Sequence, residues 1–196
     1  NAKAQLTELD HTYEVRHNDE LSKTVAKKLA DDPAGASQYA LGSNSDEGTL
    51  ATIQLAQSYR KSGRYDLEAS IINEKARRLT EAGREIQAAS MMDEMSPEAV
   101  VLSAAQTIQK YNEKITNPKK LIPELTGKIA KEFSDRATEI GKMAEGRDRN
   151  IAVTKLRQDL ANLIPSSASS KLVTVWKAGL LTSPRTTMRN IIGNTV

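Results

Sequence analysis

Two histidines and a glutamate near the N-terminus come closest, by type and spacing, to a metal site. They form the pattern His11-x-x-Glu14-x-x-His17. On a helix, each step of three residues advances the side chains by about 300°, so the three side chains fan out over roughly 120°. Zinc enzymes with a helical motif instead place two histidines four residues apart on one face. The pattern therefore favours exposed polar residues, and a metal-dependent enzyme fragment is kept only as the third hypothesis.

The sequence contains no other pattern that is typical of catalysis. Cysteine is absent, which excludes thiolate nucleophiles, thiolate metal sites and disulfides. There is no glycine-rich phosphate loop before Lys-Ser or Lys-Thr, and no Gly-x-Ser-x-Gly elbow. We therefore predict that the chain is not an enzyme and carries no cofactor, metal or catalytic residue.

Charge is distributed unevenly along the chain. Residues 1–109 carry 12 Lys and Arg against 17 Asp and Glu, a net charge of −5, whereas residues 110–196 carry 16 against 8, a net charge of +8. Such a basic half is typical of proteins that bind nucleic acid or an anionic membrane. It also arises where two halves of one chain attract each other, or where a module attracts other parts of a longer protein.

A DNA-associating module that uses the basic half is the second hypothesis. Phosphate binding needs clustered cations, but acidic residues are interleaved with these and aromatic residues for base stacking are scarce. The candidate residues for nucleic-acid contact or protein docking are Lys119, Lys120, Arg147, Arg149, Arg157, Trp176, Arg185, Arg189 and Asn190.

The composition predicts an all-α fold. Hydrophobic residues make up 38% of the chain and aromatic residues only 4%, so the core must be aliphatic, as in helix-on-helix packing. Apolar residues recur with helical spacing, and glycine, proline and serine interrupt them. We predict an irregular bundle of about 8–10 helices without a strand. The expected helices include residues 3–17, 19–31, 34–41, 49–62, 65–80, 85–95, 97–111 and 148–164, with another that begins at Pro123 and is broken up between Thr138 and Gly146. In the stretch 171–196, an apolar helix is expected to stop at Ser183-Pro184, and a short helix is expected to follow over residues 185–192.

Residues 55–76 resemble a tetratricopeptide hairpin, in which two helices meet at a glycine, here Gly63. One extra residue before Ala69 and the lack of a clean 34-residue repeat limit this to repeat-like αα-hairpins. The expected divisions are an N-terminal helical piece (1–41), a hinge loop (42–48), a central bundle (49–164) and a basic corner that contains Trp176 (165–196). Trp176 is expected to anchor a helix in the core.

Two segments of the chain have a distinctive order of residues. The first is RRLTEAGREIQAASMMDEMSPEAVVLSAAQTIQKYN (residues 77–112), and the second is WKAGLLTSPRTTMRNIIGNTV (residues 176–196). Together they resemble the helical parts of the large polyvalent proteins of phages, prophages and integrative mobile elements. Thr187 and Met188 stand where the resemblance leads us to expect histidine and a branched aliphatic residue. The resemblance implies a long multidomain protein, carried in a virion or delivered with DNA, and it transfers no catalytic residue.

The leading hypothesis is a non-enzymatic helical structural or interaction module. It spaces or docks neighbouring domains of the same large chain, or packs against virion proteins. We expect this module to be excised from a longer protein. Asn1 and Ala2 are typical of a cleaved purification tag, and residues 191–196 are typical of a chain that is cut in mid-course. No apolar run is long enough to span a membrane. The expected location is the cytoplasm of a bacterial host or a virion.

Overall fold

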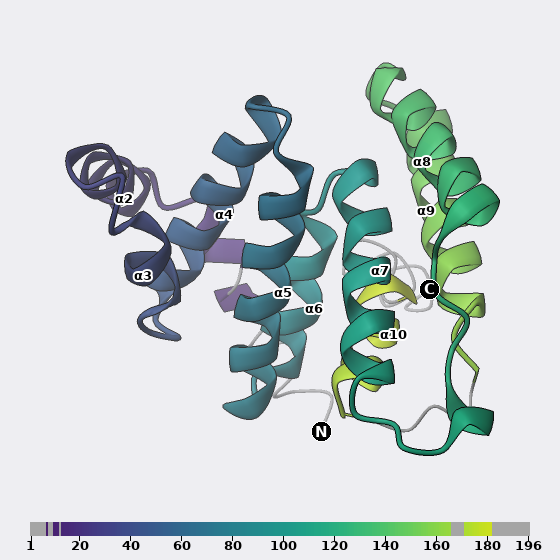
Figure 1. The fold of residues 1–196 in the computed structure, drawn as a ribbon. Coiled ribbons are helices and arrows are strands. Elements are labelled where there is room, and N and C mark those ends of the chain that lie inside the picture. Colours follow the sequence, from purple (N-terminus) through teal and green to yellow (C-terminus); the bar gives the residue numbers. More distant parts are fainter. Residues whose placement is uncertain (1–6, 8–9, 12, 166–170, 182–196) are drawn as a thin grey trace, which may run out of the picture.

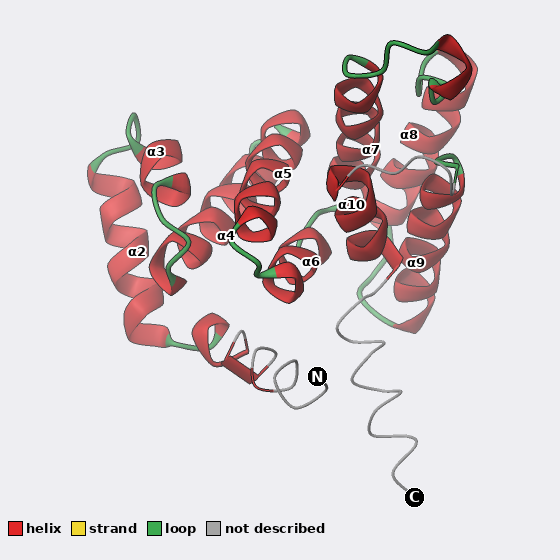
Figure 2. Ribbon diagram, turned by 90° about the horizontal axis from the view of Figure 1, so that it is seen from below, coloured by secondary structure: helices red, strands yellow, loops and turns green. Residues whose placement is uncertain are grey.

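The computed structural model describes residues 7, 10–11, 13–165 and 171–181, and this part of the chain forms α-helices and one short 3-10 helix, with no strand (Figures 1 and 2). The predicted all-α multi-helix fold is confirmed. The elements in chain order are α2 (Asp19–Asp31), α3 (Ala36–Leu41), α4 (Asp46–Lys61), α5 (Tyr65–Glu81), α6 (Glu85–Asp93), α7 (Pro97–Asn112), the 3-10 helix η1 (Pro118–Lys120), α8 (Gly127–Lys142), α9 (Arg147–Asn162) and α10 (Lys171–Leu181).

Two turns that contain glycine connect α4 to α5 and α5 to α6. Gly63 and Gly83 have φ angles of 68° and 76°, a left-handed conformation that glycine adopts without steric strain. In the first turn, the Arg64 amide donates to the Tyr59 carbonyl at 2.9 Å, so a carbonyl at the end of α4 is satisfied. The helical hairpin predicted around Gly63 is therefore present.

Serine caps set the starts of α4 and α7. Ser96 Oγ accepts a hydrogen bond from the Ala99 amide at 3.2 Å and Pro97 opens the helix, as the sequence predicted. Ser45 Oγ accepts from the Gly48 amide at 3.2 Å, so α4 begins at Asp46, earlier than the predicted Thr49. The loop before α4 is accordingly shorter than the predicted 42–48 hinge.

Helix α8 differs from the prediction at both ends. Its first residue is Gly127 instead of Pro123, because the side chain of Asn112 binds the amide and the carbonyl of Ile122, at 2.9 and 2.8 Å, and keeps that segment non-helical. At the other end, the helix continues through Gly141 to Lys142. A Cβ atom at Gly141 would lie 2.3 Å from a carboxylate oxygen of Glu98, so this glycine allows α8 to lie close to α7.

The helices form a row of stacked pairs (Figure 1). Helices α2 and α3 pack against α4 at one end, α4 packs against α5, α5 packs against both α6 and α7, and α8–α9 packs against α7 at the other end. The core between them is aliphatic, as predicted, with residues such as Ile72, Leu79, Met91, Ile108 and Leu160 almost fully buried. Among the described helices, none has the length and apolarity that a membrane span needs.

Helix α10 returns to the middle of this row and packs against α6, α7 and α9 (Figure 2). Its residues Val173, Trp176 and Leu180 are buried, with 1, 2 and 4% of their surface exposed, which confirms the core role predicted for Trp176. Gly179 allows the close approach to α6, since a Cβ atom there would lie 2.6 Å from the sulfur of Met92. The described part of the predicted C-terminal corner is thus integral to the bundle.

Candidate functional site

The predicted nucleic-acid contacts that remain exposed lie at opposite ends of α8. Lys119 and Lys120 are exposed in η1, beside the start of α8, whereas Arg147 is exposed at the first residue of α9, near the end of α8 (Figure 1). Helix α8 has 16 residues, a length of about 24 Å. These lysines and Arg147 therefore form no common patch.

Three other predicted contacts take part in internal bonds. The half-buried Arg149 donates from Nε to the Ile140 carbonyl at 3.3 Å. Arg157 is 5% exposed and forms an ion pair with the Asp93 carboxylate, and the indole N–H of Trp176 donates to Ser103 Oγ at 2.9 Å. The last three predicted contacts lie outside the described residues: Arg185, Arg189 and Asn190.

The two histidines of the N-terminal pattern have separate partners. His11 Nε2 lies 3.1 Å from an Asp46 carboxylate oxygen on α4. His17 Nδ1 bonds to the Tyr13 carbonyl at 2.8 Å, and its ring stacks on that of Tyr13 with centroids 4.0 Å apart. Within the part of the chain that the structure describes, no three His, Cys, Asp or Glu residues are placed to hold a metal ion.

Three cations converge on the C-terminal end of α3 and the loop that follows it. Lys75 and Arg78 come from α5, and Arg84 precedes α6. Carbonyls at a helix C-terminus lack helical partners and carry partial negative charge, so cations stabilise them. The contacts are Lys75 Nζ to the Ala40 and Ser43 carbonyls at 3.1 and 2.5 Å, Arg78 Nη1 to that of Leu41 at 2.7 Å, and Arg84 Nη1 to that of Asn44 at 2.5 Å.

Lys75 is the innermost of these cations, with no exposed surface. Burial lowers the pKa of its ammonium group from 10.5 to about 8, and the nearby charges of Arg78 and Arg84 add to this effect. Gly48 leaves space for the lysine, because a Cβ atom at that position would lie 3.1 Å from Nζ. The loop that was predicted as a hinge is therefore held against α5 by a buried lysine.

A second set of cations converges on the end of α6. Arg16, Arg60 and Arg157 reach it from the N-terminal segment, α4 and α9, three separate parts of the chain. They bond respectively to the carbonyls of Ser90, Glu94 and Asp93. Arg16 also lies 2.9 Å from the Glu94 carboxylate. The end of this short helix therefore ties together three regions that are distant in sequence.

Glu68 on α5 connects this set to the start of α7. Its carboxylate has no exposed surface and accepts from Arg60 Nε and Nη2 at 3.0 and 2.6 Å. It also accepts from the amide and hydroxyl of Ser96, at 2.8 and 2.7 Å. Ser96 is the residue that caps α7, so one buried carboxylate holds α4, α5 and the start of α7 together.

A chain of neutral hydrogen bonds joins α10 to α7 and α5. Trp176 donates to Ser103 Oγ, and the Ser103 hydroxyl donates to Asn73 Oδ1 at 2.6 Å. The amide of Asn73 donates to Gln106 Oε1 at 3.1 Å, and Gln106 donates to Ser70 Oγ at 3.0 Å. The chain runs from the buried bond between Trp176 and Ser103 to Ser70, which is exposed on α5.

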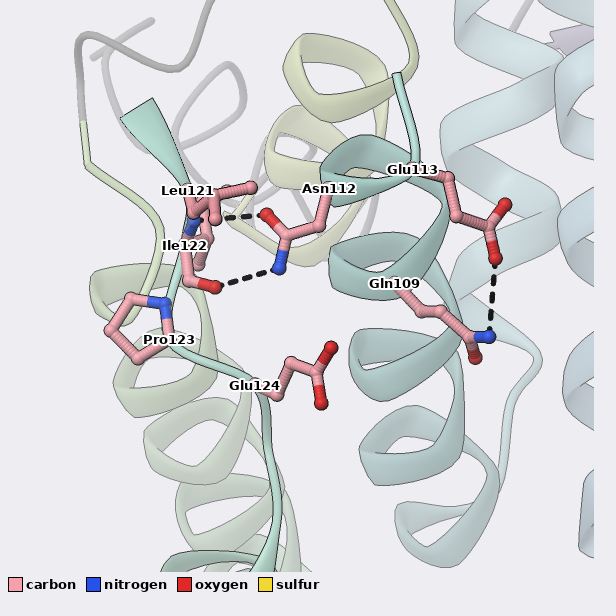
Figure 3. Close-up of a pocket in the computed structure, with 7 residues that line it drawn as sticks. All are labelled: Gln109, Asn112, Glu113, Leu121, Ile122, Pro123 and Glu124. Carbon is pink, nitrogen blue, oxygen red and sulfur yellow. Dashed lines mark hydrogen bonds between the residues drawn. The ribbon is translucent and has the colours of Figure 1, made fainter. Parts of the chain in front are cut away.

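A hollow of about 670 Å³ opens between the end of α7 and the non-helical segment 121–124 (Figure 3). Asn112 joins its two walls through the bonds to Ile122, and Gln109 donates to Glu113 at 3.2 Å. Figure 3 shows the Glu124 carboxylate directed into the space between the walls. Leu121 is 45% exposed beside it, so the lining combines two carboxylates with apolar carbon.

A second hollow, of about 450 Å³, lies over the start of α4. Lys28 and the Tyr39 hydroxyl both bind the Glu47 carboxylate, the latter at 2.6 Å. The bond from Lys28 has the largest effect in lowering the pKa of Glu47, and the bond from Tyr39 lowers it further. Burial raises the pKa of Tyr39 far above its usual value, and the hydrogen bond to Glu47 adds to this effect. Lys28 and Glu47 are thus paired with each other.

Sequence reasoning missed the buried ionic residues Glu68 and Lys75. The signal was present, because both lie on the face of α5 that carries Ala69, Ile72, Ala76 and Leu79. A charged residue on an apolar face needs a buried partner. The partners themselves come from segments 8 to 35 residues away, which helical periodicity does not identify.

The chain matches no family model, no curated protein and no solved structure.

Proposed function

We propose that this chain is a rigid, non-enzymatic α-helical spacer that holds neighbouring domains of a longer protein, or virion proteins, at a fixed separation. Its proposed setting is a large phage or mobile-element protein in a bacterial cytoplasm or a virion. The resemblance of residues 77–112 and 176–196 to the polyvalent proteins supports this setting.

The observation that carries the proposal is how the buried polar groups are used. Lys75, Glu68, Arg157 and Trp176 each bond to a different helix or loop of the bundle. Buried charges and their acceptors are destabilising when separated, because each loses its compensation in the interior. Bonds of this kind therefore oppose sliding or bending between adjacent helical pairs, which is the property that a spacer needs.

A pair of spin labels at the two ends of the row tests rigidity. The chain has no cysteine, so Lys27→Cys on α2 and Lys155→Cys on α9 give one label pair at exposed positions. We expect pulsed electron resonance to give a single, narrow distance distribution. Lys27→Cys with Lys61→Cys provides a reference pair across the neighbouring helices α2 and α4.

The width of the distribution decides the outcome. A rigid spacer gives an end-to-end distribution about as narrow as that of the reference pair. A broad or two-peaked distribution for the end-to-end pair alone would show that the helical pairs move relative to one another, and the spacer function would be rejected.

A further inference from the structure

Exposed lysines without partners are concentrated where α7 connects to α8. Residues 109–128 carry five lysines against two glutamates, Glu113 and Glu124. All five are exposed, and none has a carboxylate partner within the part of the chain that the structure describes. This lysine surface consists of Lys110, Lys114, Lys119, Lys120 and Lys128.

Other lysines differ from this set in being paired or isolated. Lys23, Lys28 and Lys131 form ion pairs with carboxylates. Lys27, Lys61 and Lys155 are exposed and form no ion pair among the described residues, but they lie one each on α2, α4 and α9. The lysine surface instead covers the last turn of α7, η1 and the first turn of α8, at one end of the molecule (Figure 1).

The residue types define what such a surface recognises. Lysine is a flexible point charge that contacts phosphate, whereas the bidentate reading of guanine typically uses arginine, which is absent from residues 109–128. The one aromatic residue of this stretch, Tyr111, is only 7% exposed, so no ring is offered for stacking on unpaired bases. These features fit a sequence-independent contact with phosphates of a double strand.

We infer that the lysine surface binds the phosphate backbone of duplex DNA without sequence preference. This activity goes beyond the spacer function and stands or falls separately from it. A duplex carries phosphates at high density along both strands, so several exposed lysines can each contact one.

Fluorescence anisotropy with a labelled 20-base-pair duplex of random sequence tests the inference. With four to five phosphate contacts, the logarithm of the affinity should fall with the logarithm of salt concentration with a slope of about −4, or roughly 10²-fold between 50 and 200 mM salt. Lys119→Gln/Lys120→Gln should weaken binding and reduce that slope by about 2. Lys27→Gln/Lys155→Gln removes the same charge elsewhere and should leave the slope unchanged.

A second double variant tests the role of the acidic hollow. Glu113→Gln/Glu124→Gln should strengthen binding, because it removes two charges that repel phosphate. Far-UV circular dichroism verifies that each variant stays folded. Absence of binding at 50 mM salt, equal weakening in both lysine variants, or stronger binding to phosphatidylserine vesicles than to the duplex would each overturn the inference.

Discussion

Replacing Glu68 with glutamine removes the charge from a carboxylate that has no exposed surface and accepts four hydrogen bonds. Glutamine has nearly the same shape, so the substitution opens no cavity. The side-chain amide nitrogen of glutamine is a donor, so it cannot replace the carboxylate oxygen whose position it takes. The bonds that this oxygen accepts from Ser96 or Arg60 are therefore lost. The change therefore tests the charge and its acceptors without altering the packing of α5.

The expected loss of stability follows from the exposure of the partners. Breaking a fully buried ion pair costs about 3–5 kcal/mol. The side chain of Arg60 is 37% exposed and regains water, which lowers that figure, while the amide of Ser96 stays buried. Losing charge-assisted hydrogen bonds costs about 1.5–3 kcal/mol. We therefore expect Glu68→Gln to reduce the free energy of unfolding by about 2–3 kcal/mol.

Urea unfolding followed by circular dichroism measures this quantity. Asp66→Asn is the matched control on the same helix, because Asp66 and its partner Arg64 are each 56% exposed and surface ion pairs contribute little to stability. A loss below 1 kcal/mol for Glu68→Gln, or a loss equal to that of the control, would refute the view that buried ionic contacts hold the bundle together.

Three further predictions concern Lys75 and α10. Because the pKa of Lys75 is lowered to about 8, the unfolded chain binds more protons than the folded chain above that pH. The free energy of unfolding should therefore rise between pH 8 and 9.5, and Lys75→Met should remove this rise in urea titrations. Trp176→Ala should cost about 3–5 kcal/mol in the same assay. Gly179→Ala should cost about 1–3 kcal/mol by crowding Met92, and adding Met92→Ala should cost less than the sum of the single changes.

Local sequence signals predicted much of the helical framework. Gly63 ends one helix, and Ser96 with Pro97 begins another, because capping depends on residues that are adjacent in sequence. The predicted start of α8 was wrong because the true start depends on Asn112. This residue lies ten positions before Ile122 and binds its backbone, which keeps the segment around Ile122 non-helical. A helix propensity contains no information about such a bond.

The candidate contacts were harder to predict, because a sequence does not show which cations remain free. Arg157 was expected on a surface, but it pairs with Asp93, 64 residues earlier in the chain. Lys119 and Lys120, drawn from the same basic half, are exposed and unpaired. Only the packing of the helices decides whether a cation is buried in an ion pair or exposed on the surface. A prediction from charge clustering alone therefore includes cations that already have an internal partner as well as cations that can contact a ligand.

The central claim is that interior bonds join the helical pairs into one rigid unit, and Trp176 provides a direct test. It is the only tryptophan, so its fluorescence reports on α10 and the packing around it, while circular dichroism reports on all the helices. A single cooperative unit predicts that both signals change with the same midpoint and slope in a urea titration. A fluorescence transition at lower urea, with most of the helical signal retained, would show that α10 separates first and would contradict the claim.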